Sequence, residues 1–173
     1  LHVRYNCFET FRLHYLIGCQ VPTYVSATLN LTHAWDFLYV YSMFSNILPT
    51  LGIDVRFVDG DDPAEFVAAA DDKTRAFFCE GVSNPSLTIF DIEGIAEQAH
   101  SIGLPLVVDS TFSTPYLCKP FDFGADIIVS SLTKWVGGHG AGLGGIIVDS
   151  GKFAWGMLLG LHIKSSFFTV PFS

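Results

Sequence analysis

The chain has 173 residues, half of them hydrophobic, and a mean hydropathy of +0.42. This length and composition are sufficient for one domain that can bury a sheet on both faces. The net charge of −8 and isoelectric point near 5.0 argue against a basic surface for nucleic acid or anionic membranes. Polar residues and a proline interrupt the uncharged stretch 13–35, so we expect no membrane-spanning helix.

The four cysteines follow no metal-binding or disulfide spacing. Cys79 and Cys118 stand among apolar or aromatic residues, which favours a role as small core side chains. No metal site is expected. The start of the sequence shows no secretory signal pattern, and with the cysteine pattern this predicts a reducing, cytoplasmic location.

The first part of the chain gives few structural signals. Residues 1–27 show no clean period of 2 or 3.6, so we assign no element there. Further on, four apolar residues at helical spacing predict one buried helix face that ends at Gly52: Phe44, Ile47, Leu48 and Leu51.

From residue 53 onward, strand and helix signals alternate. The sequence Asp62-Pro63-Ala64-Glu65 predicts a capped start for a helix over 63–70. Asp91 predicts the cap of a second helix that buries Ile92, Ile95, Ala96 and Ala99 and ends at Gly103. Strands are predicted at 54–59, 76–80, 104–109, 126–130 and 143–148. This succession predicts an α/β fold with a right-handed, doubly wound, mostly parallel sheet.

Polar residues follow two of these strands where each strand ends. Asp109 closes one strand, and Ser131, Thr133 and Lys134 follow the next. Ligands of open α/β sheets bind beyond the carboxyl ends of the strands. A lysine amine can form a Schiff base with the aldehyde of pyridoxal phosphate (PLP), and an acid can partner the pyridinium nitrogen. The alternative is that Asp109 caps a turn, the two hydroxyls bond backbone, and the lysine is solvated.

The stretch VVDSTFSTPYLCKPFDFGADIIVSSLTKWVGGHGAGLGGIIVDSGKF resembles the PLP-binding core of the Cys/Met-metabolism PLP enzymes. This resemblance implies the large domain of the type I aminotransferase-like fold. It places a partial, doubly wound core at 28–153, with unmatched segments at 1–27 and 154–173. TLNLTHAWDF, from Thr28, resembles a helix and turn of that family. TPYLCKP, GGHG and IIVDSGKF are most similar to its O-acetylhomoserine sulfhydrylase branch.

The resemblance implies a role for each candidate residue. Lys134 would carry the cofactor, Asp109 would bind its ring nitrogen, and Ser131 and Thr133 would hold its phosphate. Asn84 would contact the phenolic oxygen. The alternative is that Asn84 has no such role and only has the extended backbone that a following proline favours.

An aromatic residue would stack on the ring. Tyr39 is the first choice, with Tyr41 or Phe37 as alternatives, and all three could equally be core aromatics. His139 is expected to bond loop backbone rather than to act as a base.

The implied reaction is PLP-dependent γ-replacement on an activated homoserine, in sulfur amino-acid metabolism. The partners would be an amino-acid substrate and sulfide or a thiol, in a homo-oligomer. The alternatives are a cystathionine γ-synthase or methionine γ-lyase activity, or a non-catalytic remnant. We find no match to the family's Tyr and Arg phosphate contacts, its phosphate-binding glycine turn, or its carboxylate-binding arginine, so slow turnover is expected.

Overall fold

The computed structural model describes residues 26–30 (backbone only), 41–58, 62–84 and 87–155. Six strands form one sheet in the order β2-β1-β3-β4-β5-β6. β1 to β5 are parallel, and β6 pairs antiparallel with β5. The predicted doubly wound, mostly parallel sheet is confirmed. The strands are β1 (Ser26–Asn30), β2 (Val55–Val58), β3 (Thr74–Glu80), β4 (Leu106–Asp109), β5 (Ile127–Ser131) and β6 (Gly145–Asp149).

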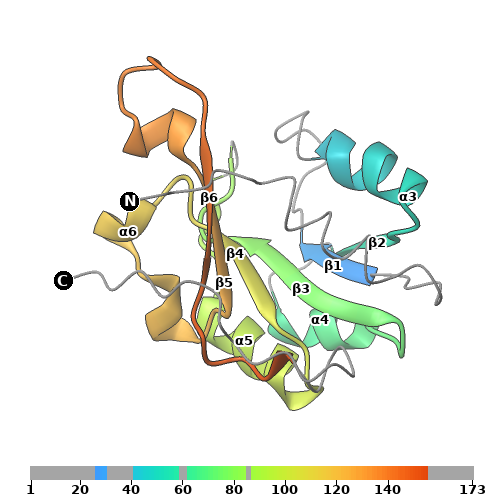
Figure 1. Cartoon of the computed structure of the whole chain (residues 1–173). Coiled ribbons are helices and arrows are strands. Elements are labelled where there is room, and N and C mark those ends of the chain that lie inside the picture. The colour runs from blue at the N-terminus through green and yellow to red at the C-terminus, as the bar shows by residue number, and fades with distance from the viewer. Residues whose placement is uncertain (1–25, 31–40, 59–61, 85–86, 156–173) are drawn as a thin grey trace.

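Helical segments cover both faces of the sheet (Figure 1). The path from β1 to β2 runs opposite to the path from β3 through β4 to β5. Right-handed crossovers therefore place the connecting segments on opposite faces. The helical segments are η1 (Met43–Ile47), α3 (Leu48–Thr50), α4 (Pro63–Ala69), α5 (Ile92–Ser101), α6 (Thr114–Leu117), η2 (Pro120–Phe123) and η3 (Leu132–Val136).

The main core lies between the sheet and the helices α4 and α5. Phe66 of α4 packs against Phe77 of β3 with their ring centroids 5.4 Å apart, and both side chains are fully buried. The apolar face predicted for α5 is buried as expected. Both predicted caps are also confirmed, because Asp62 accepts the amide of Ala64 at 2.9 Å and Asp91 accepts that of Gly94 at 3.0 Å.

Two sequence expectations were wrong. A helix and turn were expected from Thr28, but residues 28–30 belong to strand β1. β1 lies inside the sheet between β2 and β3, so pairing with distant strands decides its conformation. Ile47 and Leu51 are about half exposed. The π turn of η1 keeps Phe44 and Leu48 on the buried face but rotates Ile47 off it.

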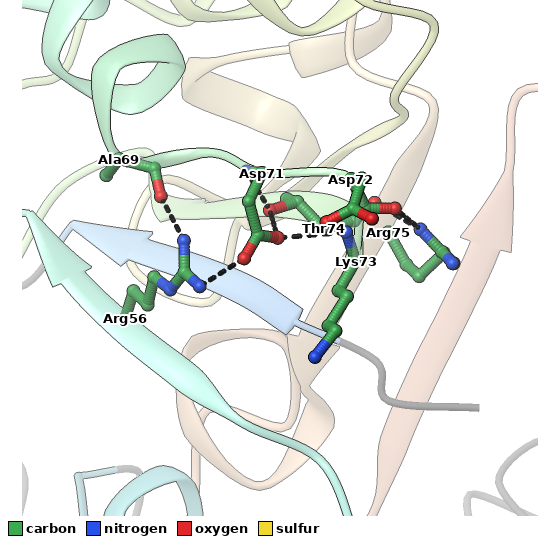
Figure 2. Close-up of polar contacts among 7 residues, drawn as sticks. All are labelled: Arg56, Ala69, Asp71, Asp72, Lys73, Thr74 and Arg75. Carbon is green, nitrogen blue, oxygen red and sulfur yellow. Dashed lines mark hydrogen bonds and ion pairs between the residues drawn. The ribbon is translucent and has the colours of Figure 1, made fainter. Parts of the chain in front are cut away.

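A polar cluster closes the turn between α4 and β3 (Figure 2). Arg56 of β2 donates to the carbonyl of Ala69 at 2.7 Å and pairs with the carboxylate of Asp71. The carboxylate of Asp71 also accepts the amide of Lys73 at 2.9 Å. The hydroxyl of Thr74 accepts the amide of Asp71 at 2.9 Å and donates to the Asp71 carboxylate at 3.1 Å. This cluster lies at the amino end of β3. It therefore stabilises the end of the sheet opposite to the carboxyl ends of the strands, where the candidate site residues lie.

Cys79 is fully buried and Cys118 packs against the main core, which confirms both as core side chains. Cys7 and Cys19 lie outside the described residues. In the described part of the chain, no helix has both the length and the apolar character needed to cross a membrane.

Candidate cofactor site

The carboxyl ends of β3, β4 and β5 meet at one edge of the sheet, because these strands are parallel neighbours. The segments that follow them leave the sheet at that same edge (Figure 1). The structure thereby brings five predicted site residues to one rim, while their roles stay predictions. The five are Asn84, Asp109, Ser131, Thr133 and Lys134.

Asp109 is the half-buried last residue of β4. Its Oδ1 accepts the amide of Thr111 at 2.7 Å, so the carboxylate does cap a turn, as the alternative prediction held. Burial raises the pKa of Asp109 above the ordinary carboxyl value, and hydrogen bonds from the hydroxyl and amide of Thr111 oppose this shift. A cationic partner at this carboxylate would favour its ionised form.

Thr111 is a site residue that the sequence analysis missed. Its hydroxyl bonds the carboxylate of Asp109 and also accepts the amide of Ser131 at 2.8 Å. A hydroxyl has one proton to donate and two lone pairs to accept with, so it can make both bonds at once. Thr111 therefore ties the end of β4 to the end of β5. The signal in the sequence was a hydroxyl two positions after the strand-ending acid.

Thr133 bonds the backbone of the glycine-rich turn. Its hydroxyl accepts the amide of Gly144 at 2.9 Å and donates to the carbonyl of the same residue at 3.3 Å. The amide of Leu132 also donates to that carbonyl, at 2.9 Å. This is the backbone-bonding alternative for Thr133, and it closes the loop that joins β5 to β6. A phosphate contact would have to share the hydroxyl with Gly144.

Lys134 stands on the exposed π turn η3, where its own backbone is non-helical. The turn is closed by the amide of Gly137, which donates to the carbonyl of Leu132 at 2.8 Å. A Cβ at Gly137 would lie 2.6 Å from that oxygen, so this position requires glycine. His139 bonds the Gly137 carbonyl through Nδ1 at 3.2 Å, which confirms the backbone-bonding role expected for it.

Two further contacts hold the rim together. Phe112, after β4, packs edge-on against Trp135 of η3 with ring centroids 5.9 Å apart. The amide of Asn84 donates to Oε2 of Glu80, the last residue of β3, at 3.3 Å. Neither contact was predicted from the sequence. Phe112 and Trp135 are distant in the chain and meet only in the fold, whereas Asn84 and Glu80 are four residues apart and meet through the turn that follows β3.

The aromatic predicted to stack on the cofactor remains untested. Tyr39 and Phe37 lie outside the described residues. Tyr41 packs against Phe57 of β2 with ring centroids 5.4 Å apart. Of the predicted site residues that the structure describes, none lines the surface hollow of about 390 Å³ formed beside Thr74, Arg75 and Leu104. Within the described ranges, no three His, Cys, Asp or Glu side chains are grouped to hold a metal ion.

Comparison with known proteins shows which family the chain resembles. The family model for Cys/Met metabolism PLP-dependent enzymes matches residues 34–165. A homocysteine synthase of Schizosaccharomyces pombe is 51% identical over 123 residues, which cover 69% of this chain and 29% of that protein. An O-acetyl-L-homoserine sulfhydrylase of Leptospira meyeri is 50% identical over 116 residues, covering 67% of this chain and 26% of that protein.

The fold agrees with these matches. A solved structure of O-acetylhomoserine sulfhydrylase from Wolinella succinogenes superposes with a TM-score of 0.69 at 38% identity, over 78% of this chain and 38% of that one. The chain thus spans less than a third of the length of the two curated relatives. It belongs to the Cys/Met metabolism PLP-dependent enzyme family.

Proposed function

We propose that the chain forms the PLP-binding core of an O-acetylhomoserine sulfhydrylase-like transferase, with Lys134 as the residue that carries the cofactor. One observation supports this most directly. Thr111 joins the carboxylate of Asp109 to the start of the segment that bears Lys134. An acid and an amine are thereby set on neighbouring strand ends, as a pyridine ring with an aldehyde substituent requires.

The chemistry of these side chains fits PLP. Asp109 is half-buried and held by Thr111, so its carboxylate is oriented before any ligand arrives. Lys134 is exposed at the rim. Ser131 and Thr133 supply hydroxyls beside a glycine-rich turn, although Thr133 also bonds Gly144. The set contains an acid for the ring nitrogen, an amine for the aldehyde and hydroxyl donors for the phosphate.

When bound, PLP withdraws electrons from the α-carbon of an amino acid. The ionised carboxylate of Asp109 would hold the ring nitrogen in its protonated form. Lys134 would hold the cofactor aldehyde and move the proton at the substrate α-carbon. Ser131 and Thr133 would bind the phosphate, Asn84 the phenolic oxygen, and Tyr39 would stack on the ring.

The substrate class follows from the relatives. Their names, homocysteine synthase and O-acetyl-L-homoserine sulfhydrylase, favour an activated homoserine and sulfide or a thiol over cystathionine γ-synthase or methionine γ-lyase chemistry. Assembly as a homo-oligomer and a cytoplasmic location complete the proposal. The unpaired thiols of Cys79 and Cys118 are compatible with that location.

Cofactor attachment can be tested directly. Purified chain is titrated with PLP, the visible absorbance is recorded, and the adduct is fixed with borohydride and mapped by mass spectrometry. We expect the label on Lys134 and its loss in Lys134→Ala. The matched control is Lys152→Ala, which removes another exposed lysine near the end of β6. Labelling spread evenly over surface lysines, or no adduct in the unmodified chain, would refute the proposal.

Turnover is a separate measurement. Sulfide-dependent homocysteine formation from O-acetylhomoserine, compared between the chain and Lys134→Ala, tests the substrate assignment. A γ-elimination product formed equally well without sulfide would favour the lyase alternative.

A further inference from the structure

Glu80 occupies a position beside Asp109 that the proposed function does not use. The two residues are register partners at the ends of β3 and β4. Partners in neighbouring parallel strands lie about 5 Å apart and project to the same face of the sheet. Both are half-buried, whereas their chain neighbours Cys79 and Val108 are buried in the core on the other face. Glu80 therefore faces the same space as the proposed ring-binding acid.

The surroundings show the effect of this pair of carboxylates. Burial, and then the negative charges of Glu80 and Asp109, raise the pKa of the Cys79 thiol to about 12. The end of β3 is fixed on β4 by the amide of Gly81, which donates to the carbonyl of Asp109 at 2.9 Å. A half-buried carboxylate at the end of a central strand needs a polar partner, so packing alone does not account for Glu80.

The polar partner of Glu80 lies in the loop between β3 and α5. The base of this loop is closed by an antiparallel bridge between Val82 and Ile89. Above the bridge, the amide of Ser83 donates to the carbonyl of Thr88 at 2.9 Å, and the amide of Thr88 donates to the Ser83 hydroxyl at 3.0 Å. The next residue is Asn84, whose amide is bonded by the carboxylate of Glu80 at 3.3 Å.

We propose that Glu80 is a positioning residue of the cofactor site: its carboxylate holds the backbone of Asn84, so that the Asn84 side chain faces the bound ring beside Asp109. This inference rests on the proposed function. It adds a residue that would touch neither cofactor nor substrate but would set the direction from which Asn84 reaches the phenolic oxygen.

The inference makes three variants behave differently. Glu80→Ala removes the acceptor, and we expect PLP affinity to fall about tenfold, as for a lost hydrogen bond to a charged group. Glu80→Gln keeps an oxygen at the same place and should stay within about threefold of the unmodified chain. Because Glu80 acts through Asn84, the double variant Glu80→Ala/Asn84→Ala should bind no more weakly than Asn84→Ala alone. The matched control is Glu97→Ala, which truncates an exposed glutamate of α5.

A second readout needs no cofactor. Amide hydrogen exchange by NMR should show Asn84 losing protection in Glu80→Ala and keeping it in Glu80→Gln and Glu97→Ala, while the amide of Ile95 in α5 is unchanged throughout. Additive effects in the double variant, or unchanged Asn84 exchange in Glu80→Ala, would overturn the inference. Failure of the unmodified chain to bind PLP would instead refute the proposed function.

Discussion

Thr111 offers the sharpest test of the rim, because one hydroxyl joins two strand ends. Thr111→Val keeps the β-branched shape and removes only the hydroxyl. The hydrogen bond to the Asp109 carboxylate is then lost, and the amide of Ser131 loses its acceptor at 2.8 Å. A bond to a charged group contributes about 1.5–3 kcal/mol, and an unpaired buried amide costs about 1–3 kcal/mol.

Because Thr111 is only half-buried, water can replace part of these interactions. We therefore expect the free energy of unfolding to fall by about 2–3 kcal/mol, toward the lower end of the summed costs. In urea this lowers the unfolding midpoint by about 1 M. Thr111→Ser keeps the hydroxyl and should lose less than about 1 kcal/mol. A Thr111→Val chain within about 0.5 kcal/mol of the unmodified protein would show that the hydroxyl does not join the strands.

Three further predictions follow from single side chains. In Asp71, burial opposes ionisation, but hydrogen bonds from Arg56, Lys73 and Thr74 and the charge of Arg56 outweigh it and lower its pKa. Asp71→Asn should therefore lower the melting temperature near neutral pH. The difference in melting temperature from the unmodified chain should shrink as the pH falls below 3.8, through the lowered pKa of Asp71. A difference that does not change with pH would contradict this. Asp109 has a raised pKa in the folded chain, so without cofactor its own contribution to stability falls as the pH rises above 3.8. Asp109→Asn should remove this contribution from the pH dependence of urea unfolding while weakening PLP binding, and an unchanged pH slope would count against the prediction. Gly137→Ala should lower the unfolding free energy by about 1–3 kcal/mol, because the new Cβ would clash with the carbonyl oxygen of Leu132. The control is Gly142→Ala, which adds a Cβ in open space and should leave the unfolding free energy unchanged. Equal effects of the two substitutions would show that the π turn does not require glycine.

Local signals in the sequence determined most of the secondary structure. The Asp62 and Asp91 caps are one-turn interactions, so the residue order suffices to predict them. The apolar period of α5 likewise depends only on helix geometry. The position of Asp109 and Lys134 at neighbouring strand ends also followed from the sequence, because the carboxyl ends of parallel strands share one edge.

The interactions between segments that are distant in the chain depend on the tertiary fold. Strand β1 pairs with β2 and β3, and no local pattern predicts a partner 25 or more residues away. Thr111 reaches Ser131 across 20 residues, and Thr133 reaches Gly144 across 11. A hydroxyl can bond any donor or acceptor within reach, so its partner depends on which chains the fold brings together. For the same reason, no role for Glu80 could be predicted from the sequence: Asp109 lies beside it only because β3 is in register with β4, whereas the Asn84 amide is a local partner four residues further along the chain.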